Sequence, residues 1–297
     1  MLDYKGVEAL AMVIAEQNFE RAAQKLFITQ SAISQRIRGL ENFYGTPMMV
    51  RTLPYRPTEL GQHLIGHFNK VTLLEEELSV QITEDASTPK LSIGLNRDSL
   101  ETWFLRLVLE KRLPTHYLLD IVADDQELLL SYFKSGHVAA CMSPSSKQQA
   151  FADVQFLGFM DYLLVASPAF KKEYFSRSAT VNEILKAPAL QFDKNDSLHK
   201  RCLERFFGIK NEVFPSHFVP SVRGFKSFTL NGLGYALLPK IDIEKELQEK
   251  ALVEIAKDLV WQEPVYWHYV TIRSNRYQEF MHKLMHEVKQ VLRASSR

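Results

Sequence analysis

The feature that most constrains the fold is the segment at residues 19–41, FERAAQKLFITQSAISQRIRGLE, which has the pattern of two short helices. Apolar residues recur at helical spacing on both sides of residues 27–29, three residues with little preference for a helix. Two small residues, Ala22 and Ala23, allow the helices to approach each other closely. Thr29 is a suitable N-cap for the second helix. The segment therefore predicts two helices joined by a tight turn.

The flanking residues extend this unit on both sides. Residues 4–17 carry apolar side chains at helical spacing and predict a first short helix. After the helix at residues 30–41, Gly45-Thr46-Pro47 indicates a turn. Residues 48–50 predict a short strand, and residues 54–57 indicate a second turn. We therefore predict a winged helix-turn-helix domain over residues 1–58.

The second helix of the pair, residues 30–41, has one apolar and one polar side. At about 100° per residue, Ile33, Ile37 and Leu40 fall on one side. The opposite side carries amide, hydroxyl and guanidinium groups, which can hydrogen-bond base edges in the major groove, whereas a merely solvated face more usually shows Glu and Lys. We predict that this face binds DNA through Thr29, Gln30, Ser31, Ser34, Gln35 and Arg38.

Two arginines of the predicted wing, Arg51 and Arg56, are candidates for contacts with phosphates or the minor groove. The alternative for each is a role in solubility alone. The chain carries 36 Lys and Arg against 35 Asp and Glu, a net charge of +1. Any affinity for nucleic acid must therefore come from a local basic surface.

A long amphipathic helix is predicted after Thr58, which caps it. Its apolar residues recur at steps of three and four: Leu60, Leu64, Phe68, Val71, Leu74, Leu78 and Ile82. A single helix of this length cannot bury such a stripe, so we expect it to pair with its copy in a second subunit. Residues 85–89 read as a hinge, which makes residues 59–89 a dimerising linker.

The remainder, residues 90–297, alternates short β-rich runs with helical ones, the pattern of parallel βαβ units. We predict strands at residues 91–95, 118–123, 138–142, 162–166, 189–192, 217–219, 236–238 and 266–272. The predicted helices include residues 100–112, 126–134 and 198–207, and a last helix that packs through one apolar side. The fold class is therefore α/β multidomain.

Catalysis and metal binding find little support in the sequence. Standard hydrolase, metalloprotease and nucleotide-binding motifs are missing, and we expect neither an enzyme nor a cofactor. His282 and His286 have helical metal spacing, but solvent-exposed histidines are favoured over a metal site. Cys141 and Cys202 are far apart and are expected in the core. The N-terminus shows no signal-peptide pattern and no apolar run approaches about 18 residues, so a soluble, cytoplasmic protein is expected.

Residues 22–52, AAQKLFITQSAISQRIRGLENFYGTPMMVRT, resemble the DNA-binding segment of LysR-type transcriptional regulators. That family has two alanines, a leucine, a Ser/Thr-Gln pair, a mid-helix serine, Leu-Glu, and Gly-x-x-Leu-Phe-x-Arg. This chain departs from the pattern with Thr29 and with Met48-Met49, both conservative changes. Segments such as NRDSLETW, DYLLV and ILKAP are most similar to the arginine- and lysine-responsive members of the family.

The resemblance implies a C-terminal effector domain like a periplasmic binding protein, with lobe I at about residues 90–162 and 266–297 and lobe II at about 163–265. It also implies a homodimer or homotetramer that binds and bends promoter DNA, and possible contact with RNA polymerase is part of the same expectation. The alternatives are a regulator of this family with another effector and a less specific architectural DNA-binding protein. A transport-type binding protein is disfavoured because of the N-terminal winged domain.

Ligands of open α/β sheets bind beyond the carboxyl ends of the strands. If the effector is lysine or arginine, its cationic side chain needs carboxylates there, since a buried unpaired charge is costly. Ser99 is expected to cap the helix after the first strand and is a candidate for binding the ligand carboxylate, with capping alone as the alternative. The candidate effector-binding residues are Ser99, Asp98, Asp124, Asp125, Asp161 and Asp193. Surface solvation is the alternative for each aspartate.

Overall fold

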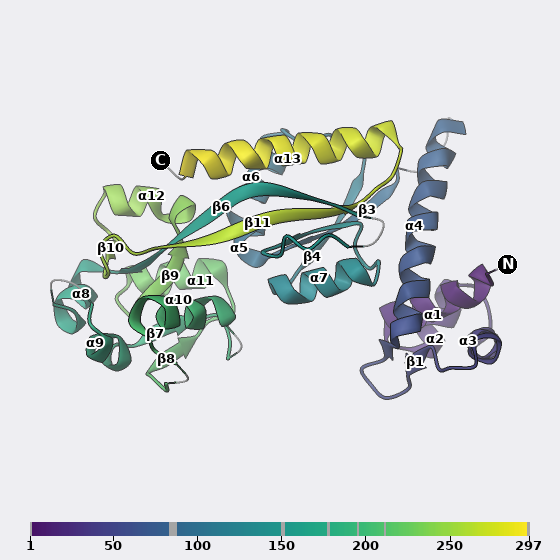
Figure 1. The fold of residues 1–297 in the computed structure, drawn as a ribbon, viewed down its shortest axis with the longest axis horizontal. Helices are drawn as coiled ribbons and strands as arrows, with labels where there is room; N and C mark the ends of the chain where they lie inside the picture. The colour runs from purple at the N-terminus through teal and green to yellow at the C-terminus, as the bar shows by residue number, and fades with distance from the viewer. Residues whose placement is uncertain are drawn as a thin grey trace. The chain divides into compact units, whose positions relative to one another are not determined.

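The computed structural model describes residues 2–82, 88–149, 152–176, 179–194, 196–210 and 212–295 (Figure 1). The chain forms two compact units, each assembled from separate stretches of sequence. Unit 1 consists of Met1–Asn96, Leu113–Gln155 and Trp267–Lys283, and unit 2 of Arg97–Arg112, Phe156–Tyr266 and Leu284–Arg297. Within the described residues, no helix is long and apolar enough to span a membrane.

The first part of unit 1 contains the three predicted N-terminal helices, α1 (Tyr4–Glu16), α2 (Phe19–Lys25) and α3 (Gln30–Tyr44). The side chains of Asp3, Asn18 and Thr29 cap them in turn by accepting hydrogen bonds from first-turn amides. Helix α3 continues beyond its predicted end at residue 41, because the left-handed residue that stops it is Gly45. The predicted helix-turn-helix is thus confirmed.

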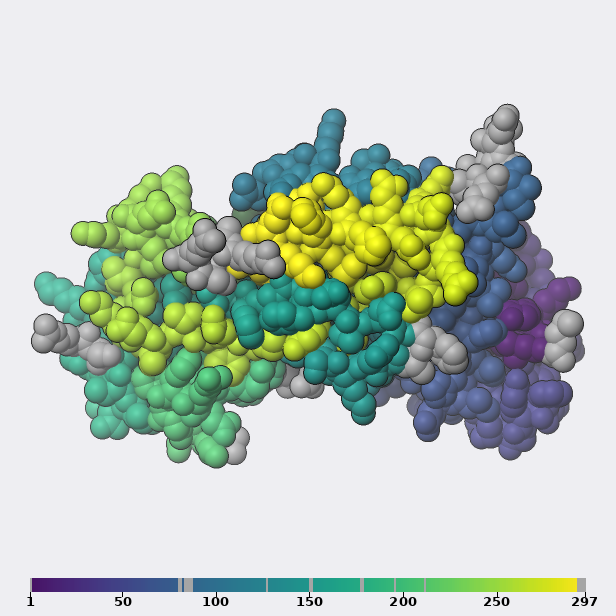
Figure 2. All heavy atoms as spheres, turned by 45° about the horizontal axis from the view of Figure 1, so that its top comes forward, coloured from purple at the N-terminus to yellow at the C-terminus, as the bar shows by residue number. Residues whose placement is uncertain are grey.

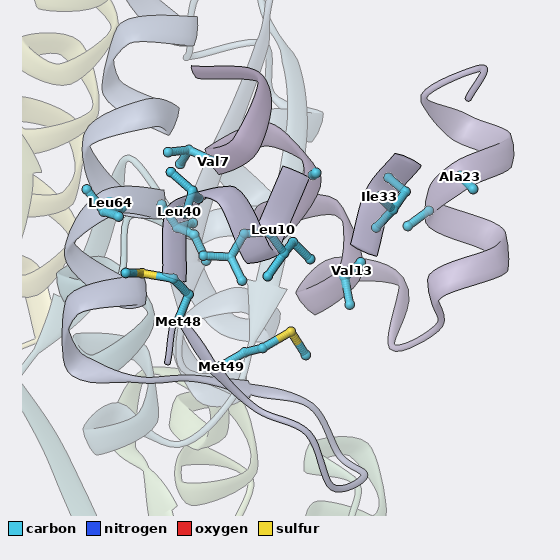
Figure 3. Close-up of a cluster of buried hydrophobic side chains, with 13 residues drawn as sticks. Val7, Leu10, Val13, Ala23, Ile33, Leu40, Met48, Met49 and Leu64 are labelled. Carbon is cyan, nitrogen blue, oxygen red and sulfur yellow. The ribbon is translucent and has the colours of Figure 1, made fainter. Parts of the chain in front are cut away.

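The wing is a two-stranded antiparallel ribbon of β1 (Met49–Val50) and β2 (Arg56–Pro57). Figure 3 shows apolar side chains of the three helices, of Met48 and Met49 and of Leu64, which together form one core. Val7 and Leu10 of α1, Ile33 and Leu40 of α3 and Met48 before β1 are all fully or almost fully buried. Because these buried side chains belong to one contiguous cluster, the domain has a hydrophobic core of its own.

Helix α4 (Glu59–Ile82) follows the wing, and its apolar stripe has two different environments. Its first part packs on the core of the helix-turn-helix, where Leu64 is buried and Phe68 is partly buried. Farther along, Leu74 and Leu78 are exposed. Only the later residues of the predicted stripe are therefore open to a second subunit. Residues 85–87 of the predicted hinge lie outside the described residues.

A further side of α4, which carries Gly66 and Glu77, packs against other parts of unit 1. The carboxylate of Glu77 is buried and accepts hydrogen bonds from the hydroxyls of Tyr117, at 2.5 Å, and Ser274. A Cβ on Gly136 would lie 2.3 Å from the Cα of Gly66, so the two backbones are in direct contact. The linker helix is consequently fixed to the sheet-bearing part of its own unit.

That sheet contains β3 (Lys90–Leu95), β4 (Leu118–Ala123) and β5 (Ala140–Ser143), with α7 (Gln126–Lys134) as a crossover helix. β3 pairs in parallel with both β4 and β5, which confirms the predicted parallel βαβ arrangement. Beyond β5, the order continues to β11 (Val260–Val270).

Two strands are longer than predicted. β6 (Ala152–Ala166) begins well before residue 162, and β11 begins before residue 266 and ends before residue 272. Residues 152–156 at the start of β6 alternate apolar and polar side chains, but Leu157 and Gly158, which has a φ of 145°, then interrupt the pattern. The segments contributed by β6 and β11 are divided between the two units.

Unit 2 contains a parallel pair, β7 (Ala189–Gln191) and β8 (Ser216–Phe218), while β9 (Ala236–Pro239) and β10 (Val253–Glu254) pair antiparallel with β6. The strand β10 was not predicted, because two residues carry no periodic signal. The helices of this unit that lie between its strands are α8 (Pro168–Tyr174), α9 (Val181–Lys186), α10 (Ser197–Phe207), α11 (Val222–Leu230) and α12 (Lys240–Gln248).

The predicted closing helix is α13 (Asn275–Ser295). Its predicted apolar side is buried as expected: Tyr277, Phe280, Met281, Leu284, Met285, Val288 and Leu292. The outer side of the helix appears in yellow on the surface shown in Figure 2 and carries the exposed His282 and His286. Cys141 and Cys202 are both buried with free thiols, which confirms their predicted place in the core.

Candidate nucleic-acid interface and effector-binding residues

Helix α3 presents the predicted polar residues on its open side. Gln30, Ser31, Gln35 and Arg38 are exposed and Ser34 is partly exposed, while Ile33 on the opposite side is buried. The local cause is the 3.6-residue period, which turns one side of α3 into the domain core and leaves the other to solvent. These side chains are therefore accessible to a ligand as large as a DNA duplex.

Thr29 is committed to local structure at the start of α3. Its Oγ1 accepts a hydrogen bond from the amide of Ala32 at 3.2 Å and lies 2.9 Å from the Ser31 hydroxyl oxygen. The cap therefore satisfies one first-turn amide and also orients Ser31. Both side chains remain exposed, so the cap and a DNA contact are compatible at this position.

The two predicted wing arginines have different surroundings. Arg51 forms an ion pair with Glu41 of α3, at 2.7 Å, and the other oxygen of Glu41 accepts a hydrogen bond from the Met48 amide at 3.3 Å. Arg51 thereby ties the wing to helix α3. Arg56 lies exposed on β2. Arg56 is a better candidate for a phosphate contact than Arg51, because the guanidinium of Arg51 is already paired with Glu41.

In unit 1, the predicted effector residues Asp124 and Asp125 follow β4, as expected. Asp124 accepts hydrogen bonds from the Asp125 amide, at 2.9 Å, and from the hydroxyl of Tyr132, at 3.0 Å. The bond from Tyr132 joins the end of β4 to helix α7. Asp124 therefore already has a structural role, and Asp125 is exposed.

In unit 2, Asp98 stands apart from the other predicted carboxylates. It lies on α5 (Arg97–Ser99) and accepts a hydrogen bond from the hydroxyl of Tyr162 on β6, at 2.9 Å. The pKa of Asp98 is raised from 3.8 to about 6: burial is the main cause and the carboxylates of Asp196 and Asp242 add to it, while the hydrogen bond from Tyr162 and the charge of Arg97 oppose the rise. The negative charge at this position is poorly compensated, so a bound cation would be stabilised there.

Ser99 does not cap the helix as predicted. It lies at the junction of α5 and a π-helical turn, η1 (Leu100–Phe104), which continues as α6 (Leu105–Leu109). Its backbone is already helical and its side chain forms no capping hydrogen bond to η1. The helix begins at Arg97, three residues before the start at residue 100 that a Ser99 cap requires, and Ser99 is consequently buried inside it.

The remaining predicted aspartates are dispersed in unit 2. Asp161 is buried on β6 and accepts a hydrogen bond from the side-chain amide of Gln262 at 3.0 Å. Asp193 is exposed after β7. Asp161 is adjacent in sequence to Tyr162, the partner of Asp98, although the side chains of neighbouring strand residues point to opposite faces.

Sequence reasoning missed residues around Asp98. The guanidinium of Arg97 lies over the ring of Phe192, 4.5 Å from its centroid. Asp196 accepts hydrogen bonds from the amides of Phe192 and His199, at 3.1 and 3.2 Å, so it shapes the loop after β7. Asp196 followed Asp193 closely in the sequence and could have been considered with it. The hydrogen bond from Tyr162 to Asp98 could not be predicted from the local sequence, because the two residues are 64 positions apart.

The unusual pKa of Asp98 leads to a testable pH dependence. Because the folded-state pKa is raised, this group stabilises the fold fully below pH 3.8, and the contribution is lost as the pH rises towards about 6. Asp98→Asn keeps an acceptor for Tyr162 without the charge. We expect the variant to gain unfolding free energy relative to the wild type between pH 4 and pH 6, by at most about 3 kcal/mol, measured by thermal unfolding of the full-length protein.

A suitable control is Asp258→Asn, which removes an exposed carboxylate from the same unit. Asp258 has a φ of 64°, a backbone conformation that asparagine tolerates. Its pH profile is expected to follow that of the wild type. Parallel curves for the wild type and Asp98→Asn over the whole range would contradict a charge penalty at Asp98.

The histidine pair of α13 is not joined by further metal ligands in the part of the chain that the structure describes. There, no group of three or more His, Cys, Asp and Glu side chains could hold a metal ion. Instead, the Nε2 atom of His286 lies 2.8 Å from the side-chain nitrogen of Gln290.

Comparisons with known proteins extend over nearly the whole chain. Residues 4–62 match the family described as "Bacterial regulatory helix-turn-helix protein, lysR family". The HTH-type transcriptional regulator ArgP of Pectobacterium carotovorum subsp. carotovorum (strain PC1) is 38% identical over 293 residues, which cover 99% of both chains.

Two solved structures share the fold. The crystal structure of ArgP from Mycobacterium tuberculosis has a TM-score of 0.84 at 28% identity and covers 97% of this chain and 98% of that chain. The full-length LysR-type regulator LysG from Corynebacterium glutamicum, with bound effector Arg, has a TM-score of 0.76 at 26% identity, with 97% and 99% covered. The similarity includes both the helix-turn-helix and the α/β part.

Proposed function

We propose, for a chain that belongs to the LysR family of bacterial regulatory helix-turn-helix proteins, that the effector controlling it is a basic amino acid, arginine or lysine. The protein is a DNA-binding transcriptional regulator controlled by a small-molecule effector. Its place of action is then the cytoplasm, where the chromosome lies. The proposal concerns the identity of the effector and the residues that bind it.

The observation that carries the proposal is the charge environment of Asp98. A partly buried carboxylate with a pKa of about 6 is an unfavourable feature in the free protein at neutral pH. A guanidinium or ammonium group beside it would offset that cost and would be bound preferentially over a neutral group. The bound arginine of the related LysG supports the same chemical class. Asp98 is therefore our primary candidate for the effector's side-chain cation.

The other predicted effector residues remain secondary candidates. Asp161 and Asp124 already accept hydrogen bonds from protein groups, so binding a ligand cation would require them to share those bonds. Asp125 and Asp193 are exposed, where solvent screening weakens an ion pair. Ser99 retains its predicted role only as a neighbour of Asp98, since it does not cap the helix.

The test is isothermal titration calorimetry of the full-length protein with arginine, lysine and citrulline, at neutral pH. Citrulline has the shape of arginine without its charge. We expect arginine or lysine to bind at least about tenfold more tightly than citrulline, because a charged hydrogen-bonded pair is worth about 1.5–3 kcal/mol. Asp98→Asn should lose that preference, whereas Asp258→Asn should keep it.

Equal binding of all three compounds would contradict a cation-selective site. Failure of every basic amino acid to bind would remove the proposed effector and leave the family membership untouched. A preference for the cation that survives in Asp98→Asn would move the site to other carboxylates, and Asp161→Asn would be the next variant to titrate.

We further propose the predicted domain division, with a winged domain at residues 1–58, a linker at 59–89 and a two-lobed effector domain at 90–297. Two linker helices would pair and place two α3 helices on the half-sites of a pseudo-palindromic operator. Pairs of dimers would form a tetramer that bends the DNA. The effector must bind two arrangements of the subunits with different affinity to change the bend or a contact with RNA polymerase.

The pairing of linker helices makes a direct prediction for α4. Leu74 and Leu78 are exposed by 47% and 54%, although both belong to the apolar stripe. The double change Leu74→Glu and Leu78→Glu would place like charges opposite each other in a symmetric helix pair. We expect this variant to have a lower molar mass than the wild type by light scattering after size exclusion, corresponding to dissociation at the linker.

Ser79→Glu is the control, because Ser79 is also exposed and the change places one negative charge, against two in the double variant, beside the apolar stripe and outside it. It should keep the mass of the wild-type assembly. A double variant whose mass equals that of the wild type would show that the exposed part of the stripe is not an interface.

A further inference from the structure

Phe27 occupies a backbone position that a bulky residue resists. Helix α2 ends in a Schellman motif, in which the Phe27 amide donates to the carbonyl of Gln24, at 3.2 Å, and the Ile28 amide donates to that of Ala23, at 3.0 Å. The residue at the centre of this motif must be left-handed, and Phe27 has a φ of 53°. Glycine or asparagine usually stands there, because a larger side chain is strained in this conformation.

The ring of Phe27 gains nothing from folding to offset that strain. Its side chain is 95% exposed, while the residues on either side, Leu26 and Ile28, pack against the core of the domain. Stability alone would therefore favour asparagine or glycine at this position. A residue that combines backbone strain with an open aromatic ring is a candidate for function.

The position of the ring indicates what it meets. Phe27 lies two residues before Thr29, the N-cap of α3, and the exposed Gln30 and Ser31 follow at once. In a helix-turn-helix, the first turn of the second helix is the part that contacts base edges. The other strongly exposed aromatic residue of this domain, Phe43, lies near the far end of α3. Phe27 is therefore beside the DNA-reading residues and separate from that second aromatic group.

We propose that Phe27 is a DNA-contacting residue, whose ring packs against apolar atoms of the operator beside the major groove. Two kinds of apolar group are present there, the C5-methyl of thymine and the carbons of deoxyribose. This inference rests on the proposed interface of α3. It adds an apolar contact to an interface that otherwise consists of polar and cationic side chains.

The experiment uses the full-length protein and a duplex operator selected with it from a random library. Phe27→Asn removes the ring and introduces a residue that suits the left-handed backbone. We expect this variant to bind the operator about tenfold more weakly, by fluorescence anisotropy, with an unchanged dependence on salt because no charge is lost. Its melting temperature should equal or exceed that of the wild type, so a folding defect cannot explain the loss.

Phe43→Ala is the matched control, since it removes a ring that is 76% exposed from the same domain. It should bind the operator like the wild type. Single thymine-to-uracil replacements in the operator distinguish the two apolar groups. A methyl contact predicts one position at which uracil weakens the wild type but not Phe27→Asn, whereas a deoxyribose contact predicts the loss in Phe27→Asn with no sensitivity to uracil.

Wild-type affinity in Phe27→Asn, or an equal loss in Phe43→Ala, would overturn the inference. Failure of the wild-type protein to prefer the selected duplex over a scrambled one is a different result. It would overturn the proposed interface of α3 itself, and the two failures are therefore distinguishable.

Discussion

A Gly61→Ala variant is expected to lose much of the stability of its DNA-binding domain and, with it, the binding of DNA. A Cβ at position 61 would lie 2.0 Å from the carbonyl oxygen of Met48, a backbone atom that cannot rotate away. That oxygen also accepts a hydrogen bond from the Thr58 amide at 3.0 Å. Relief of the clash must therefore move the wing away from α4 and break this bond. We expect a cost of about 3 kcal/mol or more, seen as a lower melting temperature.

The chain offers a matched control for this change in Gly39→Ala. Gly39 lies inside α3, is exposed, and has no atom within 4 Å of a built Cβ. Alanine stabilises a helix relative to glycine by about 0.5–1 kcal/mol, so this variant should melt at the same or a higher temperature. If Gly61→Ala melted together with the wild type, the close approach of the wing to α4 would be wrong.

An Arg38→Ala variant is expected to lose operator affinity much more than affinity for unrelated DNA. Arg38 is exposed on the polar side of α3, where a guanidinium suits the O6 and N7 atoms of guanine. A base contact of this kind contributes about 1–3 kcal/mol, so operator binding should weaken by about tenfold to a hundredfold. Anisotropy titrations with a selected operator and a scrambled duplex measure both losses at one salt concentration.

Arg56→Ala provides the contrast, because Arg56 is the open arginine of the wing. A phosphate contact carries no sequence information, so this variant should lose affinity for both duplexes alike, and the salt dependence should fall by about one charge. Similar losses on both duplexes in Arg38→Ala would instead assign Arg38 to the phosphates. Arg51→Ala is less informative, since it also breaks the ion pair with Glu41.

Much of the local structure of this chain was predictable because it depends on residues three or four apart. The caps and apolar positions of α1, α2 and α3 are read from such spacings, as is the buried side of α13. Parallel pairing of β3 with β4 and β5 followed from alternating strand and helix patterns. The early start of β6 was not predicted, because the apolar–polar alternation of residues 152–156 stops at Leu157 and Gly158, before the apolar run that begins at residue 162.

The candidate site was less predictable, because partner residues are distant in the sequence. Nothing in the local sequence distinguished Asp98 from Asp193, yet Tyr162 hydrogen-bonds the first and the second is exposed. The amphipathic pattern of α4 could not separate Leu64, which its own chain buries, from Leu78, which stays open. The strained backbone of Phe27 likewise appears only in the turn geometry.

Most helices and strands, their apolar sides and the family resemblance could thus be predicted from the amino-acid sequence alone. Those properties arise from the backbone period and from side-chain chemistry, which act over a few neighbouring residues. The tertiary structure alone decided which carboxylate is desolvated, which arginine is paired and which apolar residues remain exposed. Burial and charge depend on packing between elements that the chain brings together over long separations, and the local pattern carries no information about it.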